Sequence, residues 1–250
     1  MKTFSIGTSI CGRHIYALLY GSEAGERQLV ITASIHGREY INTELLFRFS
    51  QELELIEQKL QRKNLSVILL PLLNPDGVLI SKEIHPRFRG NWHGVDLNRN
   101  FPAGHKPSAV NGATPASEPE VRAMMNFVES LCAPAAIIHY HSVGSLIYWD
   151  YDVEGKLKNQ IRNLANLAGK CTGYRLAHST KDTLPNGGFG DWCAYEKHIP
   201  TITVETGHFF APVPHFQFSG ICRRNLPFLH ALVQEFEQEG SPAFAYPNNN

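Results

Sequence analysis

The sequence lacks a dominant charge and has few charged residues altogether. Its 250 residues contain 23 Lys and Arg against 23 Asp and Glu, so the formal net charge is zero, and charged residues make up only 18%. A protein that follows nucleic-acid phosphates normally carries a basic excess, so we expect no nucleic-acid partner. The 43% hydrophobic content excludes a disordered chain and is sufficient for one buried core.

Long apolar runs and a cysteine framework are also missing. The longest apolar run, Val67 to Leu73, contains Pro71 and is far too short to cross a membrane. Ser, Thr and Gly interrupt residues 1–20 before an apolar stretch of signal-peptide length forms. The five cysteines are odd in number, widely spaced and without a C-x-x-C pair. We therefore expect no export signal, no membrane contact, and free, mostly buried thiols in the cytoplasm.

Short runs rich in Val, Ile and Leu alternate with segments of helical period, which is the pattern of an α/β domain. We expect one domain over residues 1–240, with a mixed, mostly parallel central sheet flanked by helices, and a flexible tail over 241–250. Asn74–Gly77 has the residues of a turn, and Ser117–Glu120 matches a helix capping box. The expected strands are 28–34, 65–72, 135–141, 146–149 and 201–204, and the expected helices begin at 41, 119, 153 and 221.

Three of these strands end in residues that can bind a metal ion. His36 and Glu39 follow the first strand, His141 ends the third, and Glu205 follows the last. Each has an ordinary explanation by itself: His-x-x-Glu arises often by chance, and the neighbouring His139 suits a core histidine. The carboxyl ends of parallel strands meet at one sheet edge, however, and two histidines with a carboxylate make a catalytic zinc site when a fourth position stays open. The coincidence predicts a metal site.

Residues 81–116 are polar and too long for an idle connection in a compact domain. This segment supplies positive charge through Arg87, Arg89 and Arg99, and Gly94–Pro102 packs a carboxylate, amides and an arginine into nine positions. A surface turn explains any one of these residues but explains their combination poorly. We therefore expect the segment to carry function.

Together these residues resemble the zinc carboxypeptidase family, the carboxypeptidase A-like metallopeptidases. His36-x-x-Glu39, Asn74–Gly77, Gly94–Pro102, His141-Ser142 and Glu205 occur in the family's order, over roughly residues 28–207. The segments GVDLNRNFP, SEPE, YHSVGSLIYW and GGFGDW are most similar to the bacterial branch that cleaves cell-wall peptides, the murein peptide amidases and γ-D-glutamyl-diamino-acid endopeptidases.

The resemblance implies a zinc carboxypeptidase-like fold and one Zn²⁺ ion held by His36, Glu39 and His141. It implies that Glu205 acts as general base and proton shuttle. A further glutamate beside a metal can act on the attacking water in this way.

The resemblance also implies roles for residues in the polar segment 81–116. Arg89 matches the arginine that polarises the scissile carbonyl and stabilises the oxyanion, and Asn98 with Arg99 matches the pair that binds the substrate's terminal carboxylate. Asp96 matches the carboxylate that orients the first zinc histidine, a role with its own physical logic.

Two departures from digestive carboxypeptidases narrow the expected substrate. Residues 178–186 lack the tyrosine that caps the substrate there, and the position of the specificity residue corresponds to Gly190, which supplies no apolar or acidic pocket floor. We expect hydrolysis of the amide bond before a C-terminal diamino acid with a free carboxylate, preferably γ-D-glutamyl-meso-diaminopimelate in a murein tripeptide recycled in the cytoplasm. The alternatives are an N-acyl amino acid deacylase like succinylglutamate desuccinylase or aspartoacylase, a general metallocarboxypeptidase, and a metal-dependent binding module.

Overall fold

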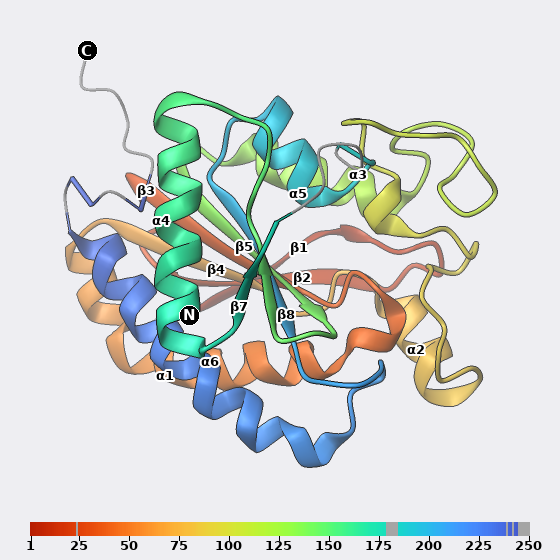
Figure 1. Cartoon of the computed structure of the whole chain (residues 1–250), viewed down its shortest axis with the longest axis horizontal. Helices are drawn as coiled ribbons and strands as arrows, with labels where there is room; N and C mark the ends of the chain where they lie inside the picture. Colours follow the sequence, from red (N-terminus) through yellow and green to blue (C-terminus); the bar gives the residue numbers. More distant parts are fainter. Residues whose placement is uncertain (24, 179–184, 239, 242, 245–250) are drawn as a thin grey trace.

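The computed structural model describes residues 1–23, 25–178, 185–238, 240–241 and 243–244, and these residues form a domain around an eight-stranded sheet (Figure 1). The strand order is β1-β2-β4-β3-β5-β8-β6-β7. The central strands β4, β3, β5 and β8 are parallel, whereas β1, β2 and β6 form antiparallel pairs. This confirms the predicted mixed, mostly parallel sheet. The strands are Lys2–Thr8 (β1), His14–Gly21 (β2), Arg27–Ala33 (β3), Leu65–Leu70 (β4), Pro134–Ser142 (β5), Leu146–Tyr148 (β6), Arg175–Ala177 (β7) and Thr201–Thr206 (β8).

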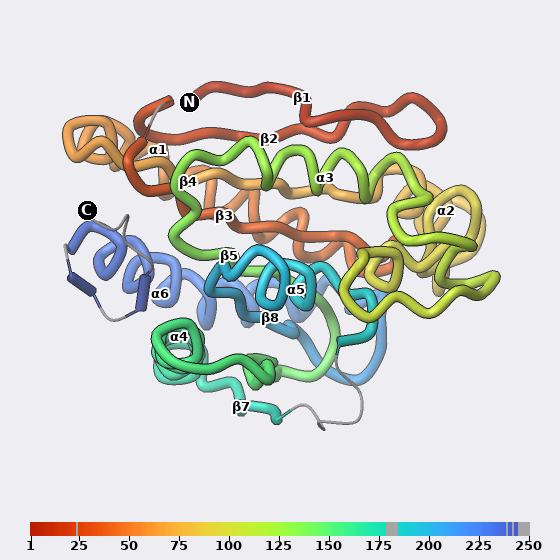
Figure 2. Tube along the Cα trace, turned by 90° about the horizontal axis from the view of Figure 1, so that it is seen from above, coloured from red at the N-terminus to blue at the C-terminus, as the bar shows by residue number. Residues whose placement is uncertain are grey.

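Helices cover both faces of the sheet. In Figure 1 the helices α1 and α6 lie below the sheet and α3 and α5 lie above it, and Figure 2 shows α3 and α5 crossing one face from above. Helix α4 packs against α6 and against the β8-β6-β7 end of the sheet. The helices are Ile41–Arg62 (α1), Pro75–Glu83 (α2), Pro119–Ser130 (α3), Gly155–Thr172 (α4), Phe189–Asp191 (α5) and Phe218–Glu237 (α6).

The core consists of two apolar clusters, one on each face of the sheet. Along β3, Leu29 and Ile31 belong to the cluster under α1, α4 and α6, whereas Val30 belongs to the cluster under α3 and α5. Successive side chains on a strand point to opposite faces. The central strands are therefore nearly continuous apolar runs, because both faces are covered.

Three local expectations differ from the structure. The sequence pattern missed the hairpin β1-β2, because β1 is an edge strand whose side chains are mostly exposed and polar. Asn74 does not close a turn but caps α2, since its side chain accepts a hydrogen bond from Gly77 N–H and Pro75 occupies the first turn. Helix α3 begins after Glu118 without a side-chain cap, so Ser117 forms no capping box.

The segment expected to be a flexible tail packs on the domain at its start. Ala243 and Phe244 are buried, with the ring centroid of Phe244 5.3 Å from that of Phe236, and Gln160 Nε2 donates to the carbonyl oxygen of Phe244. A buried aromatic ring contributes a large apolar area to the core, which holds this part of the chain on the domain. Residues 242 and 245–250 lie outside the described part of the chain.

The structure also bears on the membrane-spanning helices and the cysteines considered from the sequence. In the part of the chain that the structure covers, no helix has the length and apolar character that a membrane crossing requires. All five cysteines are free, as expected. Only Cys193 is buried, however, and Cys11 and Cys132 are exposed, so the expected burial of most thiols is wrong.

Candidate metal centre

The carboxyl ends of β3, β5 and β8 bring the candidate metal ligands to one edge of the sheet. These three strands are hydrogen-bonded neighbours, and the register places His141 of β5 beside Glu205 of β8. His36 and Glu39 follow β3 through the short 3-10 turn Gly37–Glu39. Three segments that are far apart in the sequence therefore meet at the same place.

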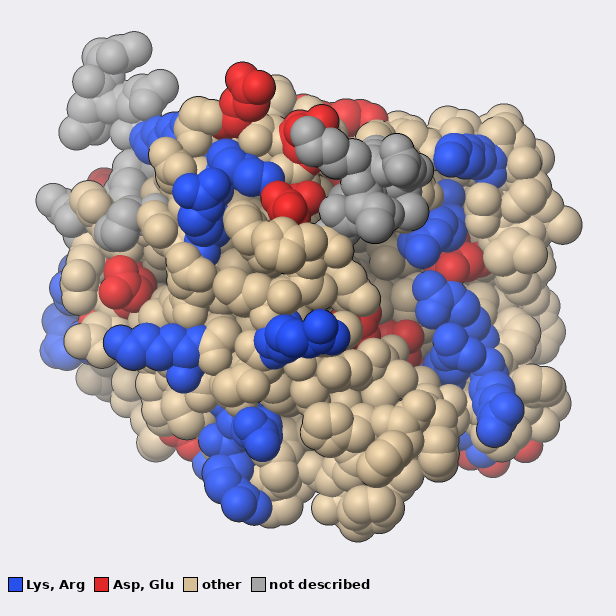
Figure 3. All heavy atoms as spheres, in the orientation of Figure 1, with Lys and Arg blue, Asp and Glu red and all other residues tan. Residues whose placement is uncertain are grey.

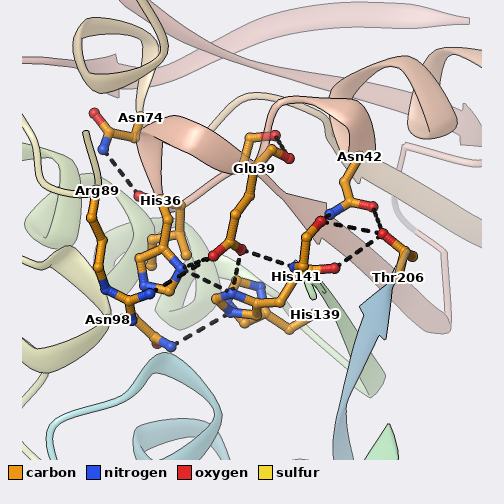
Figure 4. A network of polar contacts seen from close by, with 12 residues as sticks. His36, Glu39, Asn42, Asn74, Arg89, Asn98, His139, His141 and Thr206 are labelled. Atoms are coloured by element: carbon orange, nitrogen blue, oxygen red, sulfur yellow. Dashed lines mark hydrogen bonds and ion pairs between the residues drawn. The ribbon is translucent and has the colours of Figure 1, made fainter. Parts of the chain in front are cut away.

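His36, Glu39 and His141 form a tight group of possible metal ligands (Figure 4). His36 Nδ1 lies 2.8 Å from Glu39 Oε1, His141 Nδ1 lies 2.9 Å from Glu39 Oε2, and the two Nδ1 atoms lie 3.1 Å apart. All three residues are at most 2% exposed. Among the described residues, this is the group of His, Cys, Asp and Glu side chains that is compact enough to hold an ion.

The donor atoms fit a zinc ion. His36 faces a carboxylate with each ring nitrogen, since Nδ1 lies 2.8 Å from Glu39 Oε1 and Nε2 lies 3.1 Å from Asp96 Oδ1. A neutral imidazole can donate to only one of them, so the other nitrogen needs a positive partner such as a metal ion. A tetrahedral zinc site with bond lengths of about 2.0–2.1 Å places its ligand atoms roughly 3.3 Å apart, close to the spacing observed here. Histidine nitrogen and carboxylate oxygen are also zinc's usual donors in catalytic sites.

Local electrostatics favour the ionised Glu39 and the neutral His141 that metal binding needs. Burial alone would raise the pKa of Glu39, but the neighbouring His36 and His141 lower it well below its usual value. Burial lowers the pKa of His141, although Glu39 opposes this effect. For His36, burial lowers the pKa, but Glu39 and Asp96 raise it overall, so a metal ion there takes the place of a proton. A carboxylate and a neutral imidazole are the forms that ligate a metal.

Asp96 connects the ligand group to Arg89. Its Oδ1 lies 3.1 Å from His36 Nε2, and its Oδ2 accepts a hydrogen bond of 2.7 Å from Arg89 Nε. Burial would raise the pKa of Asp96, but His36 and Arg89 lower it far more, so the carboxylate stays ionised. The same side chain caps the 3-10 turn Leu97–Arg99 by accepting from Asn98 N–H. One carboxylate thus orients a ligand histidine and fixes the segment that follows it.

Asn98 and Arg99 reach the same cavity from that 3-10 turn. Asn98 Oδ1 accepts a 2.8 Å hydrogen bond from Phe189 N–H, and its Nδ2 lies 3.5 Å from His141 Nε2. Arg99 Nη1 donates to the carbonyl oxygen of Asn98. Both side chains line the cavity beside the metal ligands.

Glu205 faces the ligand group with an unsatisfied carboxylate. Its Oε2 atom is buried and has no hydrogen-bond partner among the described residues. Burial and the charge of Glu39 raise its pKa well above the usual value, and Arg89 opposes this rise. A buried carboxylate without a partner is costly, so it indicates a group whose partner is supplied by a ligand or by water.

A cavity of about 610 Å³ joins these residues. Figure 3 shows a hollow in this face of the molecule, with acidic atoms inside it and a row of basic side chains along its right flank. Arg38, Arg89 and Arg99 belong to the cavity wall. The structure therefore places all eight sequence-predicted site residues around one cavity: seven line it, and Asp96 supports it from behind.

The sequence patterns did not indicate Tyr151 and Thr203, which line the opposite wall of the cavity. They lie on the same wall as Gly190, the position expected to supply no pocket floor. The alternation of side chains along a strand could have indicated Thr203, which lies two residues before Glu205 and on the same face of β8. The segment expected to lack a capping tyrosine lies mostly outside the described residues, which omit 179–184.

Comparison with known proteins agrees with this geometry. The zinc carboxypeptidase family model matches residues 1–220. The chain is 25% identical to γ-D-glutamyl-L-diamino acid endopeptidase 1 of Lysinibacillus sphaericus, over 88% of this chain and 64% of that protein. Its fold is similar to bovine thrombin-activatable fibrinolysis inhibitor in complex with a tick carboxypeptidase inhibitor, with a TM-score of 0.78, 23% identity and coverage of 94% and 90% of the two chains. It is also similar to murein-tripeptide amidase MpaA from Escherichia coli O157, with a TM-score of 0.61, 21% identity and coverage of 95% and 92%.

The chain belongs to the zinc carboxypeptidase family, because the family model covers most of its length. This confirms the resemblance drawn from the motifs and identifies the chain as a member of a zinc-dependent metallopeptidase family. The chain spans less than two thirds of the length of the Lysinibacillus endopeptidase. The two structural likenesses, both under 25% identity, show a shared fold.

Proposed function

We propose that this zinc carboxypeptidase family member hydrolyses the amide bond before a C-terminal diamino acid, with γ-D-glutamyl-meso-diaminopimelate in a murein tripeptide as preferred substrate. The observation that carries the proposal is the buried, unpartnered Oε2 atom of Glu205 in a cavity that is also lined by the three clustered candidate metal ligands. The likeness to an endopeptidase acting on γ-D-glutamyl-L-diamino acid bonds supports this substrate class.

His36, Glu39 and His141 would hold one zinc ion through the atoms that face one another. When bound, zinc supplies a Lewis acid that polarises the scissile carbonyl and lowers the pKa of water toward about 7. Asp96 keeps the His36 ring in the orientation that directs Nδ1 toward the other two ligands.

Glu205 is the proposed general base and proton shuttle. Its raised pKa matches the task, since a base of higher pKa takes a proton from the attacking water more readily. The protonated Glu205 then gives this proton to the leaving amine, so that one side chain serves both halves of the reaction.

The arginines are proposed to bind the charged parts of the substrate. Arg89 Nε is occupied by Asp96, and Arg89 Nη1 lies 3.8 Å from Glu39 Oε1, so the guanidinium end lies next to the metal ligands. A positive group in this place stabilises the oxyanion that forms during attack. Arg99 and Asn98 would bind the terminal carboxylate of the substrate, because a guanidinium and an amide N–H both donate to carboxylate oxygens.

Position 190, on the far side of the cavity, bears on which terminal residue the substrate carries. Gly190 contributes no side chain. This position therefore supplies no apolar floor that would select an apolar residue, and no carboxylate that would select a basic residue. A general metallocarboxypeptidase acting on α-linked peptides and an N-acyl amino acid deacylase are the competing outcomes of the test below.

The test is product analysis by mass spectrometry after incubation of the zinc-loaded protein with L-Ala-γ-D-Glu-meso-diaminopimelate. We expect L-Ala-D-Glu and free diaminopimelate, and no reaction after zinc is removed by a chelator. Parallel incubations with α-linked tripeptides and with N-succinyl- and N-acetyl-amino acids separate the alternatives. Intact tripeptide together with turnover of either other class would overturn the proposed substrate.

The role of Glu205 is tested by Glu205→Gln, which keeps the shape but cannot accept the proton. We expect kcat to fall by at least about 100-fold while the zinc content stays at one ion per chain. Glu196→Gln changes an exposed glutamate and is the matched control. Activity of Glu205→Gln within a few-fold of the control would contradict the assignment.

We also propose that the substrate is a recycled wall fragment in the cytoplasm. The five free thiols support a reducing compartment, where disulfides are rare. Fractionation of cells that express the tagged protein tests this, and enrichment in an extracytoplasmic fraction would overturn it.

A further inference from the structure

Tyr151 holds a fixed position on the wall of the cavity. Its side chain lines the cavity, and the residue is only 5% exposed. Its backbone N–H donates to the carbonyl oxygen of Trp149, and its own carbonyl oxygen accepts from Lys158 Nζ. Its ring meets that of Tyr195 edge-on, with the centroids 6.0 Å apart. These contacts leave the phenol little freedom to move.

The Tyr151 hydroxyl takes the space that a side chain at position 190 would fill. A Cβ built on Gly190 would lie 2.4 Å from Tyr151 Oη, a distance that no real contact allows. The same Cβ would lie 3.4 Å from Tyr151 Cζ, which is ordinary van der Waals contact. A side chain at position 190 would therefore have to displace the phenolic oxygen of Tyr151, which lines the cavity at this point.

The position of Thr203 on β8 gives the distance between this part of the cavity wall and Glu205. Thr203 lies two residues before Glu205 on β8 and is paired with Tyr148 of β6. Two residues along a strand span roughly 7 Å, so this part of the wall lies about that far below Glu205. Thr203 and Tyr151 both line the cavity. Burial raises the pKa of Tyr151 strongly, and the nearby Asp191 adds to the rise, so the hydroxyl remains neutral at any physiological pH.

We propose that Tyr151 is the specificity-determining residue for the side chain of the substrate's terminal residue, in place of the empty position 190. Its hydroxyl, beside that of Thr203, hydrogen-bonds a polar group at the end of that side chain. This inference rests on the proposed function, because it concerns the residue released by the same site.

The length and chemistry of a diamino acid fit this part of the cavity wall. Its side chain reaches about 6 Å from Cα to the distal ammonium or carboxylate, close to the depth estimated from the strand. A hydroxyl both donates and accepts, so it serves either group. A purely aliphatic side chain of the same length would leave the buried hydroxyls facing methyl groups, and sites built to hydrogen-bond reject such analogues strongly.

The first test compares the wild-type protein with Tyr151→Phe on three tripeptides, L-Ala-γ-D-Glu-X, where X is meso-diaminopimelate, L-lysine or L-norleucine. Lysine and norleucine have the same chain length and differ in the terminal group. We expect Tyr151→Phe to lower kcat/KM by about 10- to 100-fold for the two polar-ended substrates, mainly through KM. For norleucine, kcat/KM should change by less than about threefold. An equal loss on all three substrates would show that the hydroxyl is merely structural and would overturn the inference.

The second test uses the close approach between positions 151 and 190. Gly190→Ala should reduce kcat/KM for every substrate, because its Cβ displaces the phenol. In the double variant Gly190→Ala/Tyr151→Phe the clashing oxygen is gone, so kcat/KM should return to within about threefold of Tyr151→Phe alone. Equal harm from Gly190→Ala in both backgrounds would contradict the geometry on which the inference depends.

Failure of the substrate proposal is distinguishable from failure of this inference. If the wild-type protein cleaves none of the γ-linked tripeptides, the proposed substrate is wrong, and the same variants are compared on α-linked L-Ala-L-Ala-L-Lys and L-Ala-L-Ala-L-norleucine. A loss of the lysine preference in Tyr151→Phe supports the role of Tyr151 on either series. An unchanged preference overturns it.

Discussion

Replacing Asp96 with asparagine should weaken zinc binding without unfolding the domain. The carboxylate lies 3.1 Å from His36 Nε2 through one oxygen and accepts from Arg89 Nε at 2.7 Å through the other. An asparagine that keeps its oxygen toward His36 turns its NH₂ group toward Arg89, so two donors face each other. The reverse orientation places the NH₂ group against the histidine. Either way one contact is lost, and the negative charge is lost as well.

The expected effect is large because the carboxylate acts through a metal ligand. Loss of a partner behind a ligating histidine typically weakens metal affinity by 10- to 100-fold, which is about 1.4–2.7 kcal/mol. We expect Asp96→Asn to fall at the upper end, since the carboxylate is buried and contacts both a ligand and an arginine. The kcat/KM of the zinc-saturated variant should also fall, because Arg89 loses its anchor.

The assay is competition for zinc between the metal-free protein and a chromophoric chelator at pH 7. Asp152→Asn changes an exposed aspartate and serves as the matched control. Circular dichroism of both metal-free variants checks that the fold is retained. A folded Asp96→Asn variant that binds zinc within threefold of the wild-type protein would refute the reasoning.

Two further predictions concern stability and the turn that carries a ligand. Burial would raise the pKa of Asp76, but hydrogen bonds from a backbone N–H and from Arg13 lower it, so its ionised form stabilises the fold above pH 4 and this contribution is lost as pH falls through the lowered pKa. Asp76→Asn should therefore cost about 2 kcal/mol in urea unfolding at pH 7 and less at pH 3, and an equal cost at both pH values would contradict this. A Cβ at Gly37 would lie 2.4 Å from the carbonyl oxygen of Gly77, so Gly37→Ala should displace the ligand turn and weaken zinc binding by at least about 10-fold. Gly220→Ala is the control, because its Cβ meets nothing within 4 Å in α6; it should leave zinc affinity unchanged and raise stability by about 0.5–1 kcal/mol.

The candidate metal ligands could be predicted from the sequence because they depend on local patterns. Buried parallel strands are continuous apolar runs, and the polar residue that ends such a run is visible in the sequence. Once β3, β5 and β8 are recognised as strands of one sheet, His36, His141 and Glu205 must lie at the same edge. The family's motif order then supplied Asp96 and Arg89, whose contacts cross from a loop to this edge.

The errors occurred where local signals are weak or compete with packing. Strand β1 at the sheet edge has little apolar periodicity, and residues 74–77 suit a turn and a capped helix start equally well. Phe244 belongs to the segment expected to be a flexible tail, but its ring packs against Phe236. In each case a contact with a distant residue decided between two local conformations of similar energy.

The sequence by itself determined the class of fold and indicated the candidate metal ligands and the carboxylate beside them, because strand periodicity and motif order are read along the chain. Only the tertiary structure decided which groups form the far wall of the cavity. Tyr151 and Gly190 are separated by a helix and a strand, and no periodic pattern relates them. Their relation arises because the Tyr151 oxygen occupies the space where a side chain at position 190 would begin, an arrangement that exists only after the sheet and α5 have packed together.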